Sequence, residues 1–143
     1  AWEIKKILLS LSDKENQKGQ VLMVGKTLKD LGFTLIGTQG TADFYNSNGI
    51  KCDVVNKIGA GRPDVVDIIM NKEVCLVINT PKAKRNYAED RKTIRKTCLK
   101  YKVNYITTLD GALAAVKGIE SVKNGNGGEG GVKSLQEYHS LIK

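Results

Sequence analysis

Residues 74–78 restrict the fold of this chain more than any other segment, because all five are apolar. A strand that is covered on one face alternates apolar and polar side chains, whereas a strand that is apolar on both faces belongs in the buried middle of a parallel sheet. Parallel strands need long crossover connections, which are usually helices. The segment therefore predicts an α/β fold with helices on both faces of a sheet.

Further strand-like segments alternate with segments of helical periodicity. In residues 21–31 apolar residues recur at helical spacing, and Gly32 is a stop signal. Pro63 and Asp64 are suited to the start of another helix, and Thr41 is suited to cap the helix that follows residues 34–37. This order predicts three layers, with a five-stranded parallel sheet between helices. We expect strands at 6–11, 34–37, 52–55, 74–78 and 105–107, and helices at 21–31, 41–46, 63–71, 89–102 and 112–119.

The length of 143 residues fits one domain. Because the chain does not begin with Met, we expect residues 1–143 to be a single domain from a larger protein. No apolar run approaches the roughly 18 residues of a membrane span, so we expect no membrane partner. The Gly-rich residues 124–131 predict a flexible loop. Ser134 and Glu137 fit a capping box that would begin a final short helix.

The net charge and the cysteines limit which partners and which kinds of site we expect for this chain. A net charge of +8 favours anionic partners, namely phosphates, nucleic acid or an acidic protein surface. The basic residues between 82 and 96 are interpreted as a solvated helix face, and no nucleic-acid-binding signature is present, so we expect no nucleic-acid partner. Cys52, Cys75 and Cys98 form no CxxC pair, and His139 is the single histidine. We therefore expect no metal site, and reduced, buried thiols in a cytoplasmic protein.

Function is expected in the loops that follow the strands, because ligands of parallel sheets bind beyond the carboxyl ends of the strands. These loops offer hydroxyls, amides and cations but few carboxylates. Such groups bind phosphate oxygens, and helix N-termini at the same edge add free N–H groups. The sequence thus predicts a phosphate-bearing small molecule as ligand. The loop residues concerned are Ser12, Asp13, Lys14, Lys18, Thr38, Gln39, Gly40, Thr41, Lys57, Asn79, Thr80, Lys82, Lys84, Arg85, Thr107 and Thr108.

Motifs of known chemistry are missing from the sequence. It contains no P-loop and no nucleophile elbow, and Gly59-Ala60-Gly61 lacks the third glycine of a dinucleotide fingerprint. His139 lies far along the chain from the polar loops, so a Ser-His-Asp centre is not indicated.

Several short motifs nevertheless follow one another in a familiar order. They are Asn56-Lys57, Gly61-Arg62-Pro63-Asp64, the run 76–80, Thr93 to Thr97, the run 105–112 and the ending 134–139. In this order they resemble the C-terminal allosteric domain of carbamoyl-phosphate synthetase large subunits, which has the methylglyoxal-synthase-like fold. The resemblance covers about residues 6–143.

The resemblance implies a regulatory domain without chemistry or cofactor of its own. The parent enzyme uses bicarbonate, ammonia from glutamine and ATP, with a divalent metal, to make carbamoyl phosphate for arginine and pyrimidine synthesis. Its partners would be the rest of the large subunit and the glutaminase small subunit. The effectors implied are UMP, commonly an inhibitor, and IMP, commonly an activator.

The resemblance also implies a phosphate site. In the family the phosphate is held by a Lys after the first strand, two Thr of a T-x-G-T turn and a Lys after the third strand. The turn and the second Lys match Thr38, Thr41 and Lys57. For the first Lys, an ungapped register selects Lys18, which we prefer, whereas the local string 13–15 selects Lys14.

The remaining effector contacts follow in the same way. Ser12 matches the family's strand-end Ser, and Asn79 matches an Asn that faces the base and ribose. Thr80 and Arg85 belong to the same effector loop, in which Pro81 replaces a residue that often carries a hydroxyl. Thr107 matches a Thr that contacts ornithine in some members, but Ile106 replaces an acidic neighbour.

The alternative is a free-standing methylglyoxal synthase that removes phosphate from dihydroxyacetone phosphate. This chemistry needs a carboxylate base, and the enzymes carry Asp-Pro after the fourth strand and a His in the next loop. Here the dipeptide is Thr80-Pro81, and no His lies between Thr80 and Lys102. A threonine hydroxyl is a poor base at neutral pH.

Overall fold

The computed structural model describes residues 5–12, 14–80 and 88–122. Strands and helices alternate strictly within them, and all strand pairs are parallel in the order β3-β2-β1-β4-β5. This confirms the predicted fold class. The elements are β1 (Lys6–Ser10), α1 (Lys18–Asp30), β2 (Thr34–Gly37), α2 (Gln39–Ser47), β3 (Asp53–Val54), α3 (Val65–Met70), β4 (Leu76–Asn79), α4 (Ala88–Tyr101), β5 (Asn104–Ile106) and α5 (Leu109–Ser121).

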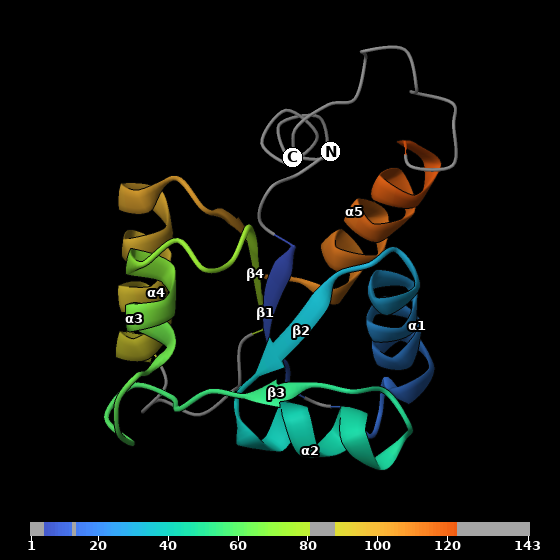
Figure 1. The fold of residues 1–143 in the computed structure, drawn as a ribbon, viewed down its shortest axis with the longest axis horizontal. Helices are drawn as coiled ribbons and strands as arrows, with labels where there is room; N and C mark the ends of the chain where they lie inside the picture. Colours follow the sequence, from blue (N-terminus) through green and yellow to red (C-terminus); the bar gives the residue numbers. More distant parts are fainter. Residues whose placement is uncertain (1–4, 13, 81–87, 123–143) are drawn as a thin grey trace.

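The sheet separates two hydrophobic cores (Figure 1). Helices α1 and α5 cover one face, and α3 and α4 cover the other. Because successive side chains of a strand point to opposite faces, Ile7 and Leu9 of β1 enter the first core and Leu8 enters the second. In β4, Val77 enters the second core and its two neighbours enter the first. This division explains why the segment 74–78 is apolar throughout.

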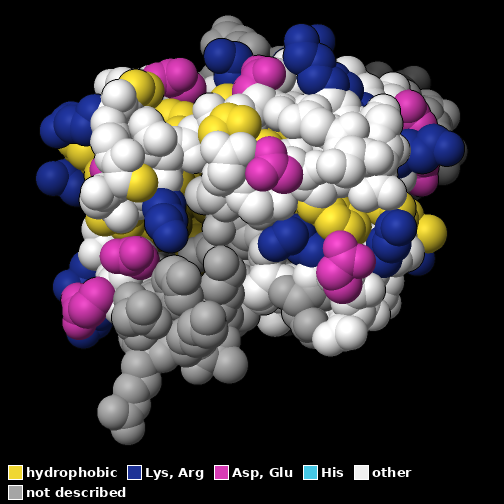
Figure 2. All heavy atoms as spheres, turned by 90° about the horizontal axis from the view of Figure 1, so that it is seen from below, with side chains coloured by type: hydrophobic (Ala, Val, Ile, Leu, Met, Phe, Trp, Pro, Cys, Tyr) yellow, Lys and Arg dark blue, Asp and Glu magenta, His cyan; other side chains and the backbone are white. Residues whose placement is uncertain are grey.

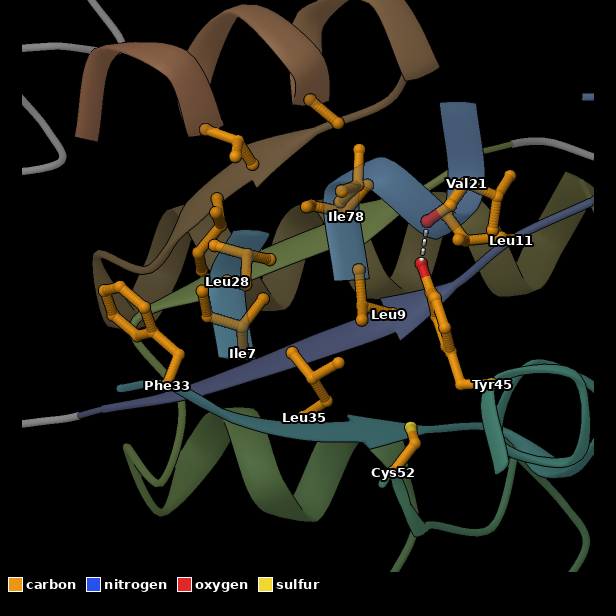
Figure 3. Packing of buried hydrophobic residues seen from close by; sticks show 14 of the residues in the cluster. Ile7, Leu9, Leu11, Val21, Leu28, Phe33, Leu35, Tyr45, Cys52 and Ile78 are labelled. Atoms are coloured by element: carbon orange, nitrogen blue, oxygen red, sulfur yellow. Dashed lines mark hydrogen bonds between the residues drawn. The ribbon is translucent and has the colours of Figure 1, made fainter. Parts of the chain in front are cut away.

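Helix α2 lies across the carboxyl edge of the sheet, below β3 in Figure 1. Tyr45 joins it to α1: the ring is fully buried, and its hydroxyl donates a 2.8 Å hydrogen bond to the carbonyl oxygen of Val21 (Figure 3). Burial raises the pKa of this hydroxyl, so it stays protonated. The Tyr45 ring also occupies the space beside Gly25, where any Cβ would collide with it.

Several helix boundaries differ from the predictions. Gly32 is confirmed as a stop, with a φ of +96° that glycine adopts at little cost. However, α1 begins at Lys18 and α5 at Leu109, about one turn earlier than expected. The prediction that Thr41 caps the second helix is wrong, because the extended residue before α2 is Thr38 and Thr41 already lies inside the helix.

The three cysteines are free, as predicted. Burial raises the pKa of the thiols of Cys52 and Cys98 to about 12 and that of Cys75 to about 11, so all three stay neutral. Among the described residues, no three Cys, His, Asp or Glu side chains come together as a metal site. None of the described helices is both long and apolar enough to cross a membrane.

Candidate functional site at the carboxyl edge of the sheet

The strand order places a crevice beside β1. From β1 the chain adds β2 and β3 on one side, and β4 then pairs on the other side. Ligands of open parallel sheets bind at such a switch point. The loops that leave β1 and β4 are joined there: the Thr80 N–H donates to the Ser10 carbonyl oxygen at 3.0 Å, and the Ser12 N–H donates to the Thr80 hydroxyl at 2.9 Å.

A pocket of about 70 Å³ opens at this edge. This volume holds several water molecules. Three apolar side chains form part of its wall, and the rest of the lining is polar or charged. The lining residues are Ser10, Thr38, Lys57, Ile58, Val65, Asn79, Thr80, Asp90, Arg91 and Ile94. Residues from β1, β4, α3, α4 and the loops after β2 and β3 therefore converge on one small space.

The N-terminus of α2 lies at the pocket. Its N-cap residue, Thr38, makes no side-chain capping bond, and its hydroxyl instead donates to Ser10 Oγ at 3.4 Å. The first N–H groups of a helix have no intrahelical partner, and the helix dipole adds positive potential there. Since the first turn of α2 contains no acidic residue, this end suits an anion.

Lys57 is carried by a loop that is closed on itself. The Val65 N–H donates to the Asn56 carbonyl oxygen at 2.9 Å, and the Asn56 side-chain amide donates to the Pro63 carbonyl oxygen at 3.2 Å. These bonds pin both ends of the loop after β3 to the start of α3. They hold Lys57 beside the pocket.

Helix α3 begins at the far end of this loop, where Asp64 predicted a helix start from the sequence, and a capping box forms its first turn. The Asp67 N–H donates to the Asp64 carboxylate at 3.0 Å, and the Asp64 N–H donates to the Asp67 carboxylate at 2.9 Å. The Asp64 backbone N–H, together with the Arg62 guanidinium 2.6 Å away, lowers the pKa of Asp67. Asp67 thus stays ionised and keeps the end of the loop in place.

The structure distinguishes the two lysines of the first loop. The Lys14 ammonium donates to the Leu11 carbonyl oxygen at 3.0 Å, and a Cβ built at Gly40 would lie 3.7 Å from it. The charge of Lys14 therefore lies at the first turn of α2. Lys18, which the ungapped register selected, is exposed at the start of α1, and neither lysine lines the pocket.

Thr41 supports the site from inside the fold. It is 1% exposed, and its hydroxyl accepts a 3.0 Å hydrogen bond from the Leu11 N–H. This bond joins the loop after β1 to the first turn of α2.

Thr41→Val is expected to lower the free energy of unfolding by about 1–3 kcal/mol, because the buried Leu11 N–H loses its acceptor while the side-chain shape is nearly kept. Thr41→Ser keeps the hydroxyl and is the control. Urea unfolding of both variants measures the difference. Equal losses for the two would show that the hydroxyl contributes nothing.

Asn79 is the most enclosed polar side chain of the pocket, at 6% exposed. Its side-chain amide donates to the Tyr105 hydroxyl at 3.2 Å. Burial raises the pKa of Tyr105, although the Asn79 hydrogen bond and the charges of Arg91 and Arg95 act against it. Tyr105 is therefore a neutral phenol that orients the amide.

Sequence reasoning did not place Ser10 or Arg91 at the site. Asp90 and Arg91 lie in the first turn of α4. Because helix N-termini lie at the same edge of the sheet as the strand ends, the predicted start of this helix could have indicated both residues. Thr107 is exposed and does not line the pocket. Outside the described residues lie Arg85, Pro81, segment 124–131, the capping box at 134–137 and His139.

A five-stranded parallel sheet with a polar pocket at its switch point defines a small, open α/β domain. The family model of the MGS-like domain matches residues 20–107, and the chain belongs to this family. It is 44% identical to the carbamoyl phosphate synthase large chain of Archaeoglobus fulgidus over 126 residues, which are 88% of this chain and 11% of that one.

Two further relatives agree. Identity is 40% over 138 residues to the large chain of Xanthomonas axonopodis, covering 96% of this chain and 12% of that one. Identity is also 40% over 116 residues to the C-terminal section of the large chain of Methanopyrus kandleri, which covers 81% of this chain and 21% of that one. The chain therefore spans about a tenth to a fifth of the length of these three relatives.

Solved structures share the fold. ForH aligns with a TM-score of 0.61 at 16% identity, covering 98% of this chain and 90% of that one. Methylglyoxal synthase from Elizabethkingia anophelis aligns with a TM-score of 0.59 at 17% identity, covering 78% of each chain. At these identities the likeness establishes the fold alone.

Proposed function

We propose that this domain binds a nucleoside monophosphate, UMP or IMP, and thereby regulates the large subunit of a carbamoyl-phosphate synthetase. The observation that carries the proposal is the convergence of Thr38, Lys57, Asn79 and Thr80 on one pocket at the N-terminus of α2. A phosphate dianion suits this end of the pocket, because a cation, a hydroxyl and the helix N-terminus all favour negative charge.

The phosphate would be held by Lys57 and Thr38, with Lys14 as the second cation. We prefer Lys14 to Lys18 because its ammonium already lies at the first turn of α2. Thr41 would act mainly as the support of that turn, since its side chain is buried against Leu11.

The rest of the pocket suits a nucleoside. The Asp90 carboxylate accepts hydrogen bonds, which the hydroxyls of a ribose supply. The Asn79 amide offers both a donor and an acceptor to a base edge, while Ile58, Val65 and Ile94 provide apolar contact for the base.

The parent enzyme in this proposal uses bicarbonate, ammonia from glutamine and ATP to make carbamoyl phosphate in the cytoplasm, with a glutaminase small subunit as partner. ATP and a divalent metal would bind in its other domains, and this domain would carry no catalytic residue. The large-chain relatives support this assignment. They do not favour a methylglyoxal synthase, and the chain's single histidine, His139, lies outside the described residues.

Isothermal titration of the chain with UMP, IMP, uridine, inosine and ornithine tests the proposal. We expect at least one monophosphate to bind about tenfold or more tightly than its nucleoside, which corresponds to 1.4 kcal/mol. Equal affinity for a nucleoside and its monophosphate would rule out the phosphate site. Conversion of dihydroxyacetone phosphate to methylglyoxal by the chain would favour the enzyme instead.

A further inference from the structure

The outer face of α4 carries a row of exposed lysines. Lys92, Lys96 and Lys100 are spaced four residues apart, so they lie above one another on the helix. Leu99 lies on the same face and is 67% exposed. These four residues are called the α4 stripe below.

The stripe is unfavourable for the isolated helix. Like charges four residues apart destabilise a helix by a few tenths of a kcal/mol per pair. Within residues 5–12, 14–80 and 88–122, none of the three lysines forms an ion pair, although Glu89 lies three residues before Lys92 and faces the first of them. The Lys100 ammonium lies 5.6 Å from the centroid of the Tyr101 ring, which attracts the cation but leaves its charge.

Exposed apolar side chains accompany these charges. Met70, the last residue of α3, is 45% exposed, and α3 packs beside α4, so Met70 and Leu99 lie near the carboxyl ends of neighbouring helices. On the left of Figure 2, the side of α3 and α4, Lys and Arg side chains lie beside hydrophobic ones, with Asp and Glu side chains among them. Basic side chains around aliphatic ones fit a protein surface that has carboxylates around an apolar recess.

Single-stranded nucleic acid fits this surface less well. Proteins that bind it combine positive charge with aromatic side chains on which the bases stack. The large hydrophobic side chains that are exposed in the described residues are Met23, Val54, Met70 and Leu99, and none of them is aromatic.

We propose that the α4 stripe docks on an acidic surface of another domain of the same large subunit, with Leu99 in an apolar recess. The identity of the subunit rests on the proposed function. Most of such a subunit lies outside this chain, which spans 11–21% of the three relatives. Helix α4 also lines the pocket through Asp90, Arg91 and Ile94. A bound ligand and a docked domain would thus contact one helix, and the helix can couple them.

Zero-length carbodiimide cross-linking of the intact large subunit tests the docking, because the reagent joins only ammonium and carboxylate groups in direct contact. We expect amide bonds from Lys92, Lys96 or Lys100 to Asp or Glu residues outside this domain. Leu99→Asp places a negative charge against the acidic partner surface. It is expected to lower the yield of the interdomain amides about tenfold, equivalent to 1.4 kcal/mol. Met23→Asp, at an exposed apolar site on α1, is the matched control and should leave the yield unchanged.

Three results would overturn the docking. The first is that none of the three lysines forms an interdomain amide, and the second is that Leu99→Asp and Met23→Asp give equal yields of these amides. The third is that the amides are lost when oligo(dT) is added at physiological salt. The last result would make the stripe a nucleic-acid site. Titration with UMP and IMP distinguishes this failure from failure of the proposed function. Cross-links without nucleotide binding would remove only the effector assignment, and nucleotide binding without cross-links would remove only the docking.

Discussion

Replacing Lys57 with alanine is expected to weaken UMP or IMP binding about 10- to 100-fold, because a hydrogen bond to a charged group contributes about 1.5–3 kcal/mol. Lys57 lies on an exposed loop that backbone and Asn56 bonds hold in place, so its side chain is not needed for folding. Isothermal titration measures the affinity, and thermal unfolding checks that the fold is kept.

Lys51→Ala is the matched control for Lys57→Ala. Lys51 is an exposed lysine just before β3, it does not line the pocket, and its loss changes the net charge equally. If both variants lose the same affinity, the effect is one of overall charge, and Lys57 does not contact the phosphate. Unchanged affinity in Lys57→Ala would contradict the prediction that Lys57 holds the phosphate.

Gly25→Ala is expected to lower the free energy of unfolding by about 1–3 kcal/mol, the usual effect of overpacking a core. Alanine is intrinsically better than glycine in a helix by about 1 kcal/mol, so the sign comes from the tertiary contact. The new Cβ would collide with the Tyr45 ring, which is fully buried and is held by its hydrogen bond to Val21.

Gly19→Ala in the same helix tests this explanation. A Cβ at Gly19 meets no atom within 4 Å, so the substitution is expected to raise the free energy of unfolding by up to about 1 kcal/mol. Urea unfolding of the two variants should give opposite signs. A stabilising effect of Gly25→Ala would mean that the Tyr45 ring moves aside at little cost.

The fold could be predicted from local patterns. Apolar runs marked β1 and β4, short strand-like segments marked the other three strands, and Gly32 and Asp64 marked a helix end and a helix start that the structure confirms. Thr41 was misjudged for a physical reason. Both Thr38 and Thr41 are suitable caps by residue type, and the bond that holds Thr41 inside the helix comes from Leu11, thirty positions away.

Fewer of the pocket residues could be predicted from local sequence patterns. Residues at strand ends, such as Thr38 and Asn79, could be assigned to one edge from the sheet alone. Arg91 could not be distinguished from the other basic residues of α4, because the direction in which a helix faces the pocket depends on its packing. The preference for Lys14 over Lys18 in the proposed site required the position of the first turn of α2, which no local spacing encodes.

The central position of β1 also determines when the pocket is completed on the ribosome. Strands β2 and β3 follow β1 within the first 54 residues, whereas β4, its other neighbour, begins only at Leu76. A nascent chain can therefore pair β1 with β2 and β3 while the opposite edge of β1 is still open, and an open edge is a site of wrong pairing. The half of the pocket built by Ser10, Thr38 and Lys57 precedes the half built by Asn79 and α4. A ligand that needs both halves recognises the chain only after α4 has been synthesised.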